Sequence, residues 1–251
     1  MAEVQGELKQ IVMLEDFLGW ELPVAGTDTT GHTPGGFRII GDGVAENDSG
    51  IVSLEADPNL NGVGRLTTTD EDKHAIGLAT PLMIDVAKMG PIVVEARFQC
   101  SDLDTKEIFV GLSDVNGDDL SLEDDMIHGA TTTITLTASD LCGFLMSSDL
   151  TDSTDLHAVF NGGSTTGETT STDIDLDAVL TAAEYRIVRL EVDPDGTARW
   201  YVDGVLKKTQ AGAVSTSTDL AAMMILESKT TECQTMDADY FYVRCGRDWT
   251  V

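Results

Sequence analysis

The segment from Tyr185 to Lys208, YRIVRLEVDPDGTARWYVDGVLKK, constrains the fold more than any other stretch of the chain. On both sides of its Pro-Asp-Gly turn, apolar and polar residues alternate with the period of two that is typical of half-buried strands. Pairing Val192 with Ala198 places all apolar residues on one face and all charged residues on the other. The same register predicts the remaining cross-strand partners: Leu190 with Trp200, Val188 with Val202, Glu191 with Arg199, and Arg189 with Tyr201. A slip of one residue would invert both faces, so the register is well specified and the apolar face needs a covering layer.

Strand patterns dominate the rest of the sequence. Short alternating runs bounded by Gly, Asp, Asn or Ser recur from Phe37 to Cys245, for example GPIVVEARFQ and DADYFYVRC. The helical signal is weak: DLDAVLTAAEY has room for one or two turns, and LKQIVMLEDFLG reads as a short helix or an extended arm. This pattern is typical of a sandwich or barrel, so we predict an all-β sandwich of two antiparallel sheets over residues 37–251.

Residues 1–36 are predicted to form an N-terminal arm outside the sandwich. They carry an apolar set joined to the sandwich by the polar segment AGTDTTGHTPGG. An exposed apolar patch of this kind usually marks an interface. We therefore expect the arm to bind a neighbouring subunit through a set of large side chains: Leu14, Phe17, Leu18, Trp20 and Leu22.

The composition excludes several partners. The chain has 15 Lys and Arg against 44 Asp and Glu, which gives a net charge of −29. Such a surface repels nucleic acid and anionic membranes, so neither is an expected partner. The four cysteines lack the short spacings of metal sites, and we expect free thiols in a reducing cytosol, with disulfides as the alternative because their number is even. The sequence shows no secretory signal and no stretch of transmembrane length.

Several segments resemble a known fold. The hairpin VRLEVDPDGTARWYVDGVL, the strand GPIVVEARFQ and the closing DADYFYVRC look like the concanavalin A-like, or laminin-G-like, jelly roll. The stretch from LEDFLGWELP through VVEARFQCSDLDTKEIFVGLSD resembles structural proteins of tailed bacteriophages, which are similar to capsid decoration (cement) proteins. This resemblance implies a non-enzymatic virion protein on the capsid exterior, assembled in the host cytoplasm. Its partners would be the major capsid protein and itself, with a homotrimer favoured over a dimer.

Two alternatives use the same fold. The first is a carbohydrate-binding, lectin-like module, for which Trp20, Tyr201 and Trp249 are candidate aromatic platforms. The second, placed last, is a glycoside hydrolase, whose paired carboxylates the segment EVDPD matches only in part. Asp195 falls in the turn of that segment and Glu191 faces Arg199, so we predict no catalytic residues.

The segment DVNGDDLSLEDD raises the question of calcium. Asp114, Asn116 and Asp118 alternate as they would in an EF-hand loop, but Asp119 stands where that loop requires glycine. The flanking segments are also strand-like rather than helical. A solvated acidic turn is therefore the preferred interpretation, no cofactor is predicted, and a looser calcium site at these three residues is the alternative.

Overall fold

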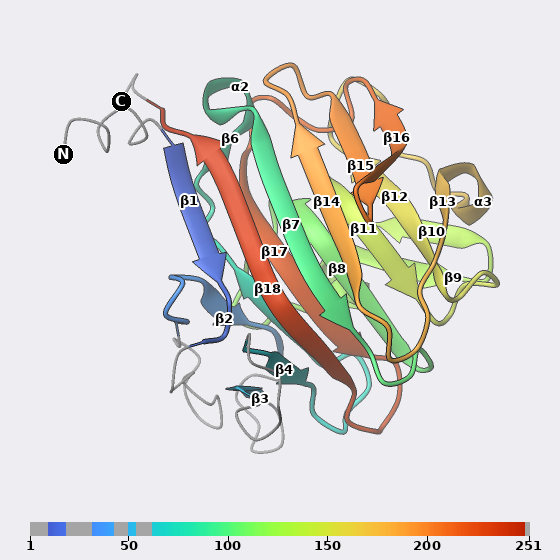
Figure 1. Ribbon diagram of the computed structural model, residues 1–251. Coiled ribbons are helices and arrows are strands. Elements are labelled where there is room, and N and C mark those ends of the chain that lie inside the picture. The colour runs from blue at the N-terminus through green and yellow to red at the C-terminus, as the bar shows by residue number, and fades with distance from the viewer. Residues whose placement is uncertain (1–9, 19–31, 43–49, 54–61, 249–251) are drawn as a thin grey trace.

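The computed structural model describes residues 10–18, 32–42, 50–53 and 62–248 (Figure 1). These residues form two large antiparallel sheets packed face to face, with a small hairpin beside them. The predicted all-β sandwich is confirmed. No helix among the described residues is long and apolar enough to cross a membrane.

Sheet A has eight strands and lies toward the viewer in Figure 1. Seven of them follow the order β16 (Val205–Gln210), β15 (Ala198–Val202), β14 (Arg186–Val192), β7 (Ile92–Gln99), β18 (Thr235–Gly246), β4 (Gly64–Thr67) and β3 (Gly50–Ser53). The eighth, β1 (Gln10–Glu15), pairs with β18 on the edge that β18 also offers to β4.

Sheet B also has eight strands and packs behind sheet A. Seven of them follow the order β13 (Asp175–Val179), β12 (Asp155–Asn161), β11 (Leu141–Ser147), β8 (Lys106–Ser113), β17 (Asp219–Ser228), β5 (Ala75–Ala79) and β2 (Arg38–Ile40). The short strand β6 (Ile84–Asp85) pairs with β17, and the turn α2 (Val86–Met89) follows it.

The outer faces of the two sheets differ in exposure. Every residue of β8 and β11 in sheet B is buried, whereas β7, β14 and β15 of sheet A alternate between buried and partly exposed residues. Beside sheet B lie the hairpin of β9 (Ile127–Ala130) and β10 (Thr133–Leu136), the π-helical turn η2 (Leu122–Met126) and the turn α3 (Ser171–Ile174). The outer face of sheet A is therefore the open face of the sandwich.

The predicted hairpin register is confirmed at every position. Val188 to Val192 of β14 pair with Val202 to Ala198 of β15 as the alternation requires. Trp200 is fully buried, and its indole nitrogen donates a hydrogen bond to the Gly143 carbonyl of sheet B at 2.7 Å. The two sheets are thus joined by a specific contact as well as by apolar packing.

The N-terminal residues differ from the predicted arm. Strand β1 is part of sheet A, and its Ile11 and Met13 pack against the core. Phe17 is also buried in the core rather than available to a partner subunit, and a Cβ added at Gly64 would overlap its ring. The sandwich therefore begins before residue 36, because β18 is longer than β4 and leaves an edge that β1 fills.

One expected helix is a strand. The segment 175–179 within DLDAVLTAAEY forms β13, and only the residues just before it, 171–174, form a helical turn. β13 completes sheet B by pairing with the edge of β12. Hydrogen bonding at this edge outweighs the local helical preference of a short segment.

Candidate ligand-binding face

Five strands of sheet A bring their outward residues into one row across the open face. The pairing registers place these residues opposite one another in turn: Leu14, Tyr242, Glu95, Arg189 and Tyr201. Neighbouring strands lie ~4.8 Å apart, so the row spans ~19 Å. We call these five residues the central row.

The chain has four tyrosines, and all of them lie at this face. Tyr201, Tyr240 and Tyr242 are on outward positions of β15 and β18. Tyr185 precedes β14, and the Arg97 guanidinium stacks 4.2 Å from the centre of its ring. Aromatic rings combine an apolar surface with a polar tip, and their concentration here is unusual in a chain with only 6% aromatic residues.

A hydrogen-bonded network links the middle of the face. Arg189 contacts Glu95 at 3.4 Å and donates from Nε to Glu191 at 2.9 Å. Tyr240 donates its hydroxyl proton to Glu95 at 2.7 Å, and Tyr201 lies 3.4 Å from Glu191. Burial and the hydrogen bond to Glu95 raise the pKa of Tyr240 above its usual value, so its hydroxyl stays protonated.

A shallow cavity of about 380 Å³ lies on this network. Leu14, Glu95, Arg189, Tyr240 and Tyr242 line it. Ligand sites commonly combine apolar and aromatic walls with a few polar groups that set orientation, and their volumes start near ~300 Å³. The depression therefore brings apolar, aromatic and charged side chains together on the open face.

The charged partners on the face differ from the predicted cross-strand pair. Glu191 and Arg199 are opposite each other in the register, but Arg199 instead contacts Asp193 at 2.6 Å. Glu191 pairs with Arg189 on its own strand. Side chains two residues apart on one face of a strand can reach each other. Which arginine pairs with Glu191 therefore depends on neighbouring strands that lie outside the hairpin sequence.

The arrangement is poorly suited to glycoside hydrolysis. The two carboxyl groups of a glycosidase flank the scissile bond, whereas Arg189 lies between Glu95 and Glu191 and contacts both. Asp195 lies in the turn and accepts a hydrogen bond from the Thr197 backbone at 3.0 Å.

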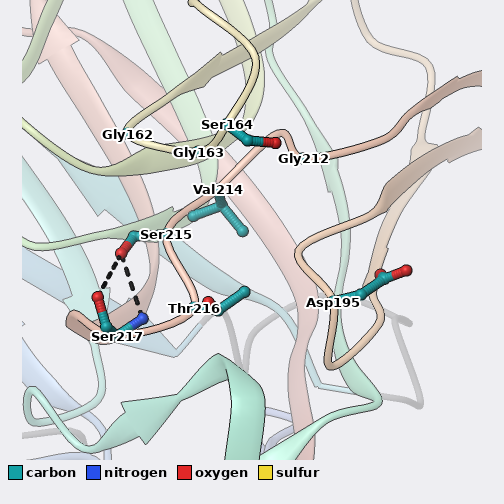
Figure 2. A pocket seen from close by; sticks show the side chains of 9 residues that line it. All are labelled: Gly162, Gly163, Ser164, Asp195, Gly212, Val214, Ser215, Thr216 and Ser217. Atoms are coloured by element: carbon teal, nitrogen blue, oxygen red, sulfur yellow. Dashed lines mark hydrogen bonds between the residues drawn. The ribbon is translucent and has the colours of Figure 1, made fainter.

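A second, smaller pocket lies where three loops meet (Figure 2). Its volume is about 220 Å³, and glycine and hydroxyl residues form most of its wall. Gly163 allows the loop after β12 to pack directly on the backbone at Gly212, since a Cβ there would overlap its carbonyl. Figure 2 shows Asp195 pointing away from the Ser215 and Ser217 hydroxyls, which contact each other. The pocket therefore lacks aromatic side chains, whereas the open face of sheet A combines aromatic side chains with paired charged groups.

The three candidate calcium ligands each have a different partner. Asp118 pairs with Arg38, Asn116 donates to the Thr80 carbonyl at 2.8 Å, and Asp114 accepts from the Asp140 backbone at 3.2 Å. Over the part of the chain that the structure describes, no group of three or more His, Cys, Asp or Glu residues could hold a metal ion.

The predicted interface residues are divided by the structure. Leu14 and Leu18 are exposed, Phe17 is buried, and Trp20 and Leu22 lie outside the described residues. Of the predicted aromatic platforms, Tyr201 lies on the open face, while Trp20 and Trp249 lie outside the described residues.

Sequence reasoning did not identify a buried ionic cluster behind sheet B. Glu107 and Glu227 are opposite each other on β8 and β17 and fully buried, with the Lys229 ammonium 3.6 Å from Glu107. Glu227 accepts hydrogen bonds from Ser121 at 3.0 Å and from backbone groups of η2. Gly129 of β9 donates to Glu107 at 2.9 Å, so the cluster fastens η2 and the small hairpin to sheet B.

The signal for this cluster was present in the sequence. Each glutamate lies beside the apolar run of a strand, IFVGL in KEIFVGLS or LAAMMIL in DLAAMMILES, and a charge in such a strand is buried only when it is paired. Burial, with the neighbouring Glu107 carboxylate, raises the pKa of Glu227 to about 8.

Comparisons with known proteins identify the fold and no closer relationship. No protein-family model matches the sequence, and no curated protein matches it. A protein of unknown function from Shewanella oneidensis MR-1 superposes with a TM-score of 0.59 at 10% identity, over 100% of this chain and 95% of that one. A β-glucanase from Bacillus licheniformis gives 0.50 at 14% identity, over 94% and 98%. The carbohydrate recognition domain of Emp46p gives 0.49 at 11% identity, over 78% and 87%.

These similarities assign the chain to the concanavalin A-like jelly-roll fold. At 10–14% identity they show the fold alone, and they do not tie the chain to capsid decoration proteins. Function must therefore be argued from the open face of sheet A.

Proposed function

We propose that this chain is a non-enzymatic carbohydrate-binding protein that holds an extended glycan along the central row of sheet A. The observation that carries the proposal is the row itself, in which apolar and aromatic side chains flank a central pair of hydrogen-bonding side chains over ~19 Å. A sugar ring presents apolar C–H faces and polar hydroxyl edges, so it needs this combination of groups.

The chemistry of each position fits that role. Tyr242 and Leu14, at one end of the row, offer apolar surface for a ring face, and Tyr201 does so at the other end. Glu95 and Arg189 between them are fixed by mutual contact and by Tyr240. Polar groups held in place lose little entropy when a ligand binds, which favours specific hydrogen bonding to hydroxyls.

Binding to a panel of soluble polysaccharides tests this proposal. We expect native gels containing mixed-linkage β-glucan, laminarin, xylan, glucuronoxylan or pectin to retard the chain in at least one case. The substrates should remain uncleaved on prolonged incubation. If no polysaccharide retards the protein, the proposal fails, and release of reducing ends would refute its non-enzymatic part.

A matched pair of variants locates the site. Leu14 and Leu82 are both 47% exposed, but only Leu14 lies on the central row. Leu14→Ala should weaken glycan binding severalfold, and Leu82→Ala should leave it unchanged. Equal effects of the two variants would show that binding occurs elsewhere.

Capsid decoration is the second candidate, and exposed apolar side chains near the N-terminus favour it. Val12 and Leu18 are each 58% exposed in a strongly acidic chain. Such side chains could anchor the chain, as a homotrimer, to the major capsid protein while the acidic surface keeps particles dispersed. Mixing undecorated capsids with Leu18→Ser, rather than with a truncated chain that lacks Phe17, tests the anchor without disturbing the core. Unchanged capsid binding by this variant would count against it.

A further inference from the structure

Arg244 lies on the open face beside the central row. It is on β18, two residues after Tyr242, and its cross-strand partners are Val12 of β1 and Val93 of β7. Residues two apart on a strand point to the same side, so Arg244 and Tyr242 are neighbours on the outer surface.

Arg244 and Tyr242 differ from the other polar residues of this face because their side-chain polar groups have no partner among the described residues. The other arginines of this face are each paired with a carboxylate: Arg65 with Asp237, Arg97 with Asp239, Arg189 with Glu95 and Glu191, and Arg199 with Asp193. Within the described residues, the Arg244 guanidinium and the Tyr242 hydroxyl make no hydrogen bond or ion pair.

We propose that Arg244 and Tyr242 bind one carboxylate-bearing sugar of the glycan. This inference rests on the proposed function and narrows its ligand from carbohydrates in general to acidic glycans. A guanidinium presents a planar fork of donors that matches both oxygens of a carboxylate, and the Tyr242 ring lies ~6.8 Å along the strand, within reach of the same sugar.

The surroundings strengthen such a contact. Val12 and Leu14 of β1 flank the pair through their registers with Arg244 and Tyr242. Apolar neighbours displace water from a bound ligand, and a charge-assisted hydrogen bond is stronger where water is excluded. The pair is thus placed where a carboxylate would contribute specificity.

The net charge limits which acidic glycan fits. A chain with a net charge of −29 repels a dense polyanion, and among the described arginines on the strands of the open face Arg244 alone lacks a carboxylate partner. The preferred ligand is therefore a largely neutral polysaccharide with isolated uronic acid residues, rather than a polymer charged at every sugar.

Affinity measurements with chemically matched polysaccharides test this inference. The probes are glucuronoxylan and its carboxyl-reduced form, partly and fully methyl-esterified pectin, and polygalacturonate as the dense polyanion. We expect the sparsely acidic member of at least one pair to bind on the order of 10- to 100-fold more tightly than its neutral counterpart. Polygalacturonate should bind more weakly than that member.

Three variants separate recognition from structural effects. Arg244→Gln should abolish the preference for the acidic form while neutral binding remains, and Arg244→Lys should restore it only in part because lysine lacks the planar fork. Arg199→Gln removes a paired arginine of the same face and should leave the preference intact. Unchanged melting temperatures would confirm that all three variants fold.

The outcomes distinguish this inference from the proposed function. If neutral and acidic forms bind equally well, or if Arg244→Gln keeps the preference, carboxylate recognition is refuted and glycan binding stands. If none of the polysaccharides binds, both proposals are refuted.

Discussion

Replacing Phe17 by alanine tests whether the N-terminal residues are part of the folded sandwich. Phe17 is 1% exposed, and its ring fills the space that the absence of a side chain at Gly64 leaves open. Its neighbour Leu18 is 58% exposed and serves as the matched control. The two substitutions remove apolar side chains at consecutive positions that differ in burial.

The magnitude follows from burial. Transfer of a phenylalanine side chain from water to the core contributes ~1.5–3 kcal/mol, and the cavity left by Phe17→Ala brings the expected loss to ~3–5 kcal/mol. The backbone at Phe17 has a φ of 54°, which alanine tolerates no better, so no stability is regained there. Leu18→Ala should change the free energy of unfolding by less than ~0.5 kcal/mol.

Urea melts followed by circular dichroism measure both changes. The slope of the unfolding free energy with urea should be the same for the wild type and both variants, so the midpoint shift reports stability directly. Gly64→Ala should also destabilise, because the added methyl group would overlap the Phe17 ring. Equal small losses for Phe17→Ala and Leu18→Ala would refute the assignment of this segment to the core.

Three further predictions concern the sandwich itself. Trp200→Ala should cost ~3–5 kcal/mol in urea melts and Arg199→Ala less than ~1 kcal/mol, since only Trp200 is buried between the sheets; equal losses would contradict the register. Because the pKa of Glu227 rises from 4.5 to about 8 on folding, the folded state holds this proton more tightly, and stability should fall as pH rises through that window. Glu227→Gln should flatten this pH dependence, and an unchanged slope in melts at several pH values would refute the assignment. Iodoacetamide should label Cys233 in the native protein before the three buried cysteines, as peptide mass spectrometry can show, because burial raises the pKa of their thiols; uniform labelling would show that those strands are open.

Much of the fold was predictable because strand alternation is a local property. The hairpin from Tyr185 to Lys208 carries its own turn and an unambiguous apolar face, so its register and the burial of Trp200 follow from 24 consecutive residues. The period-two alternation in DYFYVRC likewise places Tyr240, Tyr242 and Arg244 on one face of their strand, in agreement with the pairing of β18.

The tertiary structure alone decided which strands from distant parts of the sequence are neighbours. Glu95, Arg189 and Tyr242 come from three distant segments, and they meet because β18 and β14 pair with opposite edges of β7. β1 joined sheet A for the same reason, since the free edge of β18 offered hydrogen bonds that an isolated arm would lack. Alternation fixes which side of a strand faces outward, but pairing between distant strands depends on the packing of the whole chain, so the candidate site became visible only after the sheet was assembled.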